Sequence, residues 1–283
     1  MTWTLTDNLT DYLATAGGFL RADPVRNTIQ LVATETLRAR GLAAFSEVAP
    51  LFGWWRSSDG EITAALLHTP PYPVLLTRLP PGAARPLAEA LVACRRTLPG
   101  VTAEAGDAAE FAACWSALTG TGGQEFRRSR LYELGRLIAP SPPPPGAARA
   151  AAAADRDLIA PWLVAFAAEI DDIASRDPAE VLDDRFSYQG LTLWETGGTA
   201  VALAGANRPA AGTVRIGPVY TPPGHRRRGY GSAVTAAVSQ AALDAGAGHV
   251  VLFTDLANPA SNSVYLRLGY RPVEDRVVLR FGS

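Results

Sequence analysis

The chain has 283 residues, of which 48% are hydrophobic and 19% are charged, and its formal net charge at pH 7 is -1. These values are typical of a globular protein long enough for two domains, and they exclude an intrinsically disordered chain. A nearly neutral chain is also not expected to be held to nucleic acid or to acidic lipid by its overall charge.

The N-terminal part is predicted to begin with helices and to continue into a β-hairpin. Two strand-like runs within residues 52–69 flank Asp59-Gly60, a dipeptide that favours the tight turn of a hairpin. The run PVLLTRL (residues 73–79) is predicted to be the next strand, and an alanine-rich helix is expected after Pro80-Pro81-Gly82. The predicted order here is strand, turn and helix.

Residues 138–147 are predicted to be a linker. They contain the four consecutive prolines Pro142 to Pro145, which favour an extended, semi-rigid chain. The sequence is therefore divided into an N-terminal domain over residues 1–137 and a C-terminal domain over residues 148–283.

The C-terminal part predicts an α/β domain. Asp155 and Asp177 are candidate N-caps for two helices, and proline follows Asp177 at a first helical position. Two strands are expected on either side of Gly197-Gly198. The later predicted elements are a strand over residues 212–221, a helix over 229–245, a buried strand over 249–255, a short helix between Asn258 and Gly269, and two closing strands.

The turn TPPGHRRRGYGSA (residues 221–233) lies between a predicted strand and a predicted helix. Backbone N–H groups at a helix start have no intrahelical partner, and Gly229 and Gly231 let an anion approach them because glycine has no Cβ. Arg226, Arg227 and Arg228 add charged donors, so the turn predicts a phosphate or diphosphate site. A solvated basic turn and a nucleic-acid patch are the alternatives, and the neutral overall charge disfavours the second.

The strand before this turn contains Gly217-Pro218. Proline donates no hydrogen bond to a sheet, so the pair predicts a bulge at which neighbouring strands diverge. Backbone groups of Val219 and Thr221 beyond that point are expected to bind an extended, amide-bearing ligand as a strand would. A plain edge strand with its proline facing water is the alternative.

The spacing Arg226-x-x-Gly229-x-Gly231, after a strand and before an alanine-rich helix, resembles the acyl-CoA signature of the GNAT superfamily of N-acetyltransferases. The stretch LFTDLANPASNSVYLRLGYRPV (residues 252–273) resembles the strand, helix and strand that follow in that family. The resemblance covers about residues 148–283. Within the family it is nearest to bacterial acetyltransferases whose C-terminal domain is similar to glycine N-acyltransferases.

The resemblance implies an α/β fold with a mixed, mostly antiparallel central sheet flanked by helices. It also implies acetyl-CoA, or another acyl-CoA, as co-substrate. The residues that it implies for binding CoA are Val219, Tyr220, Thr221, Arg226, Arg227, Arg228, Gly229, Tyr230, Gly231, Ser232, Asn258, Asn262 and Tyr265. Asn258, Asn262 and Tyr265 follow helical spacing, so they are expected on one helix face.

Tyr265 is the expected general acid, because a phenol can donate a proton or a hydrogen bond to the leaving thiolate. Packing of the helix on the sheet is the alternative role. The strand TVRIG has no carboxylate where many members of this family place a glutamate. An ordered water relayed by Glu169 or His225 is therefore the expected base. No two of the three histidines have metal-ligand spacing, so no metal is expected.

Arg215 is a candidate for binding the acceptor. It alternates with Val214 and Ile216, so it points to the opposite face of its strand and could pair with a carboxylate of an amino-acid acceptor. A surface or structural ion pair is the alternative.

The N-terminal domain resembles a degenerate second copy of the same plan. Superposing its Pro-Pro-Gly on that of the C-terminal domain places Leu87 at Gly229 and Glu89 at Gly231. Glu89 would repel a diphosphate, so this domain is expected to support the acceptor cleft or the contact of a homodimer.

The expected activity is transfer of an acetyl or short acyl group from acyl-CoA to a primary amine of a small molecule, by direct attack in a ternary complex. A non-catalytic CoA-binding sensor or scaffold is the alternative. All 26 basic residues are arginine, and the abundance of Ala, Gly and Pro indicates a GC-rich, bacterial genome. Neither a signal peptide nor a long apolar run is evident, which predicts a cytoplasmic protein without a membrane or nucleic-acid partner.

Overall fold

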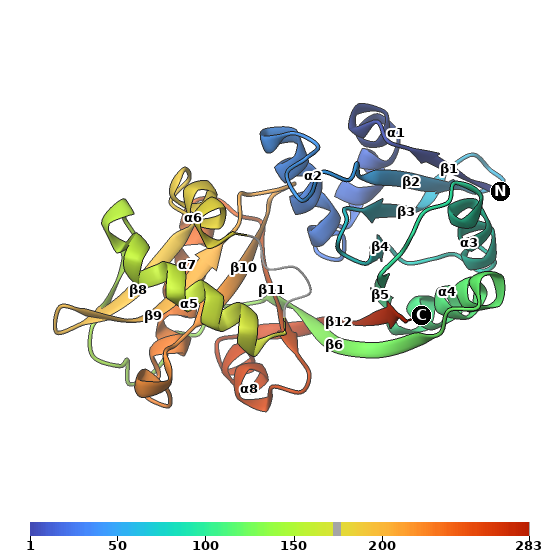
Figure 1. Cartoon of the computed structure of the whole chain (residues 1–283). Helices are drawn as coiled ribbons and strands as arrows, with labels where there is room; N and C mark the ends of the chain where they lie inside the picture. The colour runs from blue at the N-terminus through green and yellow to red at the C-terminus, as the bar shows by residue number, and fades with distance from the viewer. Residues whose placement is uncertain (172–176, 283) are drawn as a thin grey trace. The chain divides into compact units, whose positions relative to one another are not determined.

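The fold is known from a computed structural model, which describes residues 1–171 and 177–282. Internal contacts divide the chain into two compact units, each of which contains strands and helices (Figure 1). Unit 1 comprises Met1–Arg130, Asp255–Ala257 and Glu274–Ser283, and unit 2 comprises Leu131–Thr254 and Asn258–Val273.

Unit 1 contains a mostly antiparallel sheet in which β4 and β5 form a parallel pair. Its strands follow the order β1, β2, β3, β4, β5, β12, β6, and the last two strands also extend into unit 2. The elements are β1 (Thr2–Thr6), α1 (Leu9–Ala22), α2 (Thr28–Arg40), β2 (Leu51–Arg56), β3 (Ile62–His68), β4 (Val74–Leu76), α3 (Ala84–Ala93), β5 (Gly100–Glu104), α4 (Ala105–Thr119), β6 (Gly123–Leu134) and β12 (Tyr270–Phe281).

Side chains alternate between the two faces of the unit 1 sheet, and helices pack on both faces. Leu66 of β3 and Leu76 of β4 lie in one core cluster with Leu87 of α3 and Phe111 of α4. On another strand, Phe52 stacks on Tyr12 of α1, with ring centroids 5.0 Å apart. Burial of these apolar side chains holds the helices on the sheet.

Unit 2 repeats this plan, with β10 and β11 as its parallel pair. Its strands follow the order β12, β6, β11, β10, β9, β8, β7. Its remaining elements are β7 (Ala147–Ala150), α5 (Arg156–Glu169), α6 (Pro178–Phe186), β8 (Leu191–Thr196), β9 (Thr199–Ala206), β10 (Thr213–Tyr220), the 3₁₀ turn η2 (Pro223–His225), α7 (Tyr230–Asp244), β11 (His249–Asp255) and α8 (Pro259–Arg267).

Helices cover the unit 2 sheet in two groups. Ile216 of β10 and Leu252 of β11 share a core cluster with Val234 of α7 and Tyr265 of α8. Leu193 of β8 lies in a separate cluster with residues of α5 and α6. The predicted fold class, a mixed and mostly antiparallel sheet flanked by helices, is confirmed.

The two halves of the sequence exchange their last strands. Residues 276–280 of β12 pair with residues 100–104 of β5, so the C-terminal end of the chain completes unit 1. Residues 131–134 of β6 belong to unit 2, where β6 lies beside β11. Each unit therefore depends on a segment from the other half of the sequence.

Residues 138–147 lie within unit 2 by contacts. The N–H of Ile138 donates to the carbonyl of Leu268 at 3.0 Å, and the indole Nε1 of Trp194 donates to the carbonyl of Pro145 at 3.0 Å. This segment is therefore hydrogen bonded to the unit at both ends.

Local turn and cap predictions agree with the structure, apart from one cap. The hairpin turns at Asp59-Gly60 and Gly197-Gly198 are present, and the Asp177 carboxylate accepts from the Ala179 N–H at 2.9 Å. Asp155 was wrongly predicted as a side-chain cap: its carboxylate instead accepts from the N–H of Ala152 at 2.8 Å and pairs with Arg149. The charge-assisted hydrogen bonds between the Asp155 carboxylate and the Arg149 guanidinium are stronger than a bond from the carboxylate to a helix N–H group.

Candidate functional site

A β-bulge interrupts β10 just after the last residue that pairs with its parallel neighbour β11. The register with β9 pairs Ile216 with Ala206 and then Val219 with Ala204, so Gly217 and Pro218 stand opposite the single residue Gly205. Pairing with β11 ends at Ile216 and Leu252, although β11 continues to Asp255. The predicted bulge is present, and the two parallel strands separate beyond it.

The turn after β10 contains two residues in the left-handed region of backbone conformation. Arg227 and Gly229 have positive φ values of 61° and 84°, and α7 begins at the next residue, Tyr230. No side chain of the described residues caps this helix start. A Cβ at Gly231 would lie 3.2 Å from Oγ1 of Thr221, so a glycine keeps this place open. The first N–H groups of a 15-residue helix are thus left for a ligand.

The three arginines of the turn differ in their surroundings. Arg226 donates through Nε to the carbonyl of Thr221 at 2.8 Å and forms an ion pair with Glu169, and its guanidinium lies 5.7 Å from the ring centre of Tyr220. Arg227 and Arg228 are exposed at the rim of the turn. The structure therefore brings Arg226 and Glu169 together.

Asn258 and Asn262 have structural partners at the start of α8. The Asn258 side chain caps the helix by accepting from the N–H of Ser261 at 3.0 Å, as its position predicts. Asn262 donates to the carbonyl of Asn258 at 2.8 Å and accepts from the hydroxyl of Tyr132 at 2.9 Å. Tyr132, from β6, was not among the predicted site residues, because its contact spans 130 positions of the sequence.

Tyr265 is buried on the inner face of α8. Its ring lies between Tyr132 and Tyr270, with centroids at 6.4 Å and 6.0 Å. Burial raises the pKa of Tyr265 to about 12. The phenol is therefore neutral at physiological pH and keeps a proton to donate.

Arg215 is half-buried on β10, and its neighbours Val214 and Ile216 belong to the core cluster that contains α7. Its backbone N–H donates to the side chain of Asn207 at 2.5 Å. Arg215 therefore lies on the sheet face opposite α7, as alternation predicts.

The histidines occupy separate environments. His225 is half-buried at the end of η2. His68 is fully buried and accepts through Nδ1 from Arg96 at 2.9 Å, and His249 lies 2.7 Å from Glu133. Among the described residues, no group of three or more His, Cys, Asp and Glu side chains could hold a metal ion.

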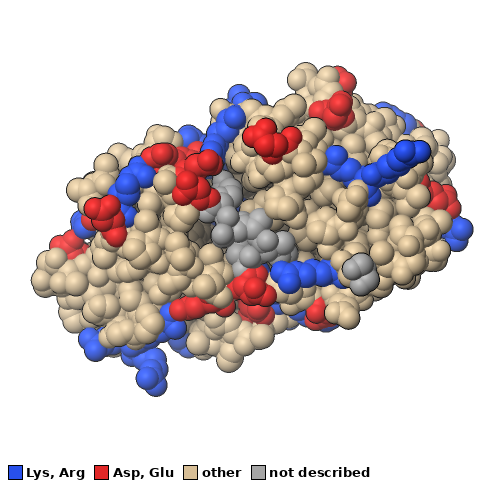
Figure 2. Space-filling model, viewed as in Figure 1, with Lys and Arg blue, Asp and Glu red and all other residues tan. Residues whose placement is uncertain are grey.

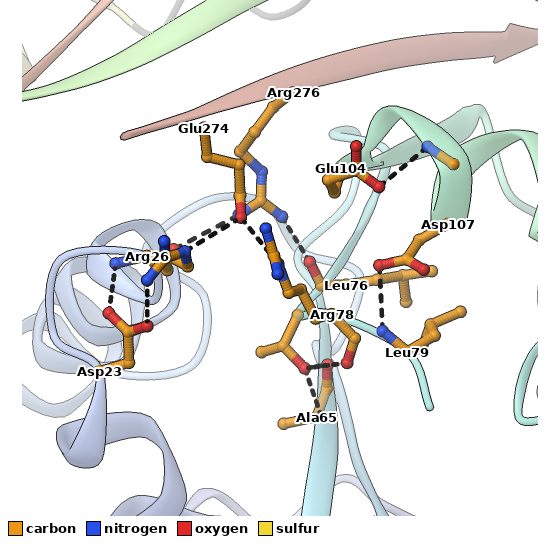
Figure 3. Close-up of polar contacts among 12 residues, drawn as sticks. Asp23, Arg26, Ala65, Leu76, Arg78, Leu79, Glu104, Asp107, Glu274 and Arg276 are labelled. Atoms are coloured by element: carbon orange, nitrogen blue, oxygen red, sulfur yellow. Dashed lines mark hydrogen bonds and ion pairs between the residues drawn. The ribbon is translucent and has the colours of Figure 1, made fainter. Parts of the chain in front are cut away.

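The corresponding region of unit 1 is filled by charged side chains (Figure 3). At the last residue of β4, Arg276 donates to the carbonyl of Leu76. Three residues further along, Asp107 accepts from the N–H of Leu79 at 3.0 Å. Leu79 corresponds to Thr221 when the two Pro-Pro-Gly segments are superposed. At this position the N–H of Leu79 is bonded to a side chain in unit 1, whereas in unit 2 the carbonyl of Thr221 is bonded to Arg226.

Glu274 completes this cluster from β12. Its side chain is 3% exposed and lies 3.2 Å from Nε of Arg78, 3.5 Å from Nε of Arg26 and 3.5 Å from Nη1 of Arg276. Buried charges of opposite sign compensate the loss of hydration. The cluster is thus a structural part of the unit 1 interior.

The surface charge is mixed. On the face of the molecule drawn in Figure 2, arginines and acidic side chains are interspersed. None of the helices in the described ranges, 1–171 and 177–282, is both long and apolar enough to cross a membrane.

A family model matches part of the chain. Residues 153–270 match the model described as "Acetyltransferase (GNAT) family". A search of curated proteins finds no match.

Solved structures show the same fold over most of the chain. A GCN5-related N-acetyltransferase from Sphaerobacter thermophilus aligns with TM-score 0.62 and 18% identity, over 98% of this chain and 95% of the other. One from Kribbella flavida aligns with TM-score 0.53 and 23% identity, over 78% and 87%. A tandem GNAT protein from the clavulanic acid biosynthesis pathway aligns with TM-score 0.54 and 14% identity, over 99% and 98%. These likenesses identify the fold as GNAT-like.

Proposed function

We propose that the protein is an N-acyltransferase that moves an acetyl or short acyl group from acyl-CoA to a primary amine of a small molecule. The observation that carries this proposal is the uncapped start of α7, which follows a bulged strand that separates from its parallel neighbour. The match of residues 153–270 to the GNAT family supports it. So does the tandem GNAT neighbour, which has the length of this chain.

The residues present fit CoA. The N–H groups at the start of α7 would bind the diphosphate, with Arg227 and Arg228 at its rim. Backbone groups of Val219 and the N–H of Thr221, beyond the bulge, would bind the amide-bearing pantetheine arm, while the Thr221 carbonyl is bonded to Arg226. Asn258 and Asn262 already bond to protein groups, so their proposed contribution is to fix α8 beside the arm.

The proposed reaction is a direct transfer. The neutral amine attacks the thioester carbonyl, a C–N bond forms, and the C–S bond breaks as the sulfur leaves with its electron pair. Tyr265 would donate its proton to that sulfur, and a water relayed by Glu169 or His225 would take the proton lost by the amine. Backbone N–H groups at the bulge would stabilise the oxyanion.

Arg215 is proposed to recognise a carboxylate on the acceptor. It is half-buried and lies on the sheet face opposite α7, away from the helix start proposed to bind the diphosphate. An amino acid such as glycine therefore belongs in any panel of test acceptors. This choice agrees with the resemblance of the sequence to glycine N-acyltransferases.

The proposal is tested by incubating the protein with acetyl-CoA and a panel of amines, reading free thiol and product mass. Tyr265→Phe keeps the ring packing but removes the proton, so kcat is expected to fall about a hundredfold with little change in CoA affinity. Tyr270→Phe is the matched control, because the Tyr270 hydroxyl pairs with Ser239 at 2.6 Å inside the core. Equal losses in the two variants would assign Tyr265 a packing role.

A second candidate is a CoA-binding sensor without catalytic activity. The ion pair between Glu169 and Arg226 favours it, because it engages the one carboxylate expected to relay a proton. CoA binding without turnover of any amine would support the sensor. Salt-dependent retention on DNA that is lost when Arg226, Arg227 and Arg228 are replaced would instead support nucleic-acid binding.

A further inference from the structure

The bulge of β10 creates a hydrogen-bonding problem. Pairing with β11 ends at Ile216, so the carbonyl of Gly217 lies beyond the parallel ladder. The register with β9 is also broken here, between Ile216 and Val219. A carbonyl at such a break needs another donor, because an unpaired buried backbone group is costly.

Arg185, from α6, supplies that donor. Its Nη2 donates to the carbonyl of Gly217 at 3.1 Å, and its Nη1 donates to the carbonyl of Ala206. Ala206 is the β9 partner of Ile216, the last residue before the bulge. One half-buried guanidinium therefore joins the two strands at the point where their regular pairing stops.

The bulge is also held tightly by its neighbours. A Cβ at Gly205 would lie 2.7 Å from the carbonyl oxygen of Gly217 and 3.0 Å from Cδ of Pro218. The bulged backbone is thus packed closely on Gly205 of β9, and Arg185 bonds its carbonyl. The guanidinium fork fits this task because it donates two hydrogen bonds in a fixed geometry.

We propose that Arg185 is a positioning residue for the acyl end of the CoA site. By holding the carbonyls of Gly217 and Ala206, it fixes the direction in which Val219 and Thr221 leave the bulge, and so presets the backbone groups that would bind the pantetheine arm. This inference rests on the proposed function. It assigns Arg185 no contact with the substrate and no part in the diphosphate cradle.

The test compares two ligands in direct binding measurements by calorimetry. Acetyl-CoA occupies the whole site, whereas adenosine 3′,5′-bisphosphate carries the nucleotide end of CoA without the pantetheine arm. Arg185→Ala is expected to raise the Kd of acetyl-CoA about tenfold and to leave that of the bisphosphate unchanged. Lysine can reach one of the two carbonyls but not both, so the Kd of acetyl-CoA for Arg185→Lys is expected to lie between those of wild type and Arg185→Ala.

The matched control is Arg156→Ala. Arg156 lies on α5, pairs with Asp183 of α6 and lies over the ring of Phe186, so it contacts the same helix away from the bulge. It is expected to leave both affinities unchanged. Circular dichroism of each variant establishes that the compared proteins are folded.

The outcomes separate the two proposals. If wild-type protein binds neither ligand, the proposed function fails. If wild type binds both and Arg185→Ala and Arg185→Lys weaken both equally or leave both unchanged, the positioning role of Arg185 is overturned while the proposed function stands. A selective loss for acetyl-CoA supports it, since general damage to the fold would affect both ligands.

Discussion

In each unit a Pro-Pro-Gly turn and a helix connect the two strands of the parallel pair, but the turns and helix starts differ between the units. Neither α3 nor α7 begins with a side-chain cap, but in unit 2 the turn reaches the helix through Gly229, whose φ is 84°. In unit 1 the equivalent residues, Leu87 and Glu89, lie on α3, where Leu87 is fully buried and Glu89 pairs with Arg85. The same backbone plan therefore carries a potential anion site in one unit and a packed helix in the other.

The strand ends differ in the same sense. In unit 1, Asp107 bonds the N–H of Leu79 and Arg276 bonds the carbonyl of Leu76. In unit 2, Arg185 bonds the bulge itself, and the residues that follow it lead to the glycine turn. Charged side chains thus bond different backbone groups at the strand ends of the two units.

The largest effect is expected from breaking the buried cluster of unit 1. Glu274→Gln removes the carboxylate shared by Arg26, Arg78 and Arg276, and should lower the free energy of unfolding by about 3 kcal/mol, because the buried Arg276 loses its counter-charge. Urea unfolding followed by tryptophan fluorescence measures this loss. Glu89→Gln, in an exposed ion pair, is the control and should change it by less than about 0.5 kcal/mol. Equal effects would show that the cluster is not structural.

Exchanging the residues that distinguish the two turns should give the next largest effect. Gly231→Glu places in unit 2 the residue type that unit 1 has at Glu89. The new side chain would crowd Thr221 and put a carboxylate at the anion cradle, so the Kd of CoA should rise on the order of a hundredfold. Calorimetry measures both this affinity and the stoichiometry.

The reverse change, Glu89→Gly, is the control for that exchange. It should leave one CoA bound per chain with unchanged affinity, because Asp107 and Arg276 still fill the unit 1 strand ends. A second bound CoA in this variant would contradict the contrast between the units.

A smaller effect concerns the pH dependence of unit 1. Burial, reinforced by the charge of Arg96, lowers the pKa of His68 to about 4. The unfolded chain binds a proton near its ordinary pKa of about 6.5, whereas the folded protein does not, so stability is present above that pH and is lost as pH falls toward 4. Between pH 7 and pH 5 this group should cost about 2 kcal/mol of unfolding free energy.

The measurement is urea unfolding at several pH values for wild type, His68→Asn and His225→Asn. His68→Asn should flatten the dependence in this window, whereas His225→Asn, at a half-buried turn, should retain it. Parallel curves for wild type and His68→Asn would show that His68 is not the titrating group.

Local signals accounted for much of the fold and the candidate site. The hairpin at Asp59-Gly60, the cap at Asn258 and the bulge at Gly217-Pro218 follow from conformational preferences of neighbouring residues. The glycine turn and the helix after it were predictable for the same reason, because the φ of Gly229 and the room at Gly231 depend on residue type.

Contacts between distant positions could not be predicted. Arg276 reaches Leu76 across 200 positions, Tyr132 reaches Asn262 across 130, and Arg185 reaches Gly217 across 32. Asp155 shows the same limit at short range, since its carboxylate binds Arg149 rather than its own helix. A side chain takes the partner that folding brings nearest, and neighbouring residues do not specify that partner.

The sequence by itself determined where a strand bulges, where the hairpins turn and where the glycine turn leads into a helix, because these properties depend on the backbone freedom of glycine and proline and on local capping groups. Only the tertiary structure decided that unit 1 fills its own strand ends, that Arg226 pairs with Glu169 and that Arg185 holds the bulge. Those outcomes depend on desolvation and charge pairing between segments that meet only after the chain has folded.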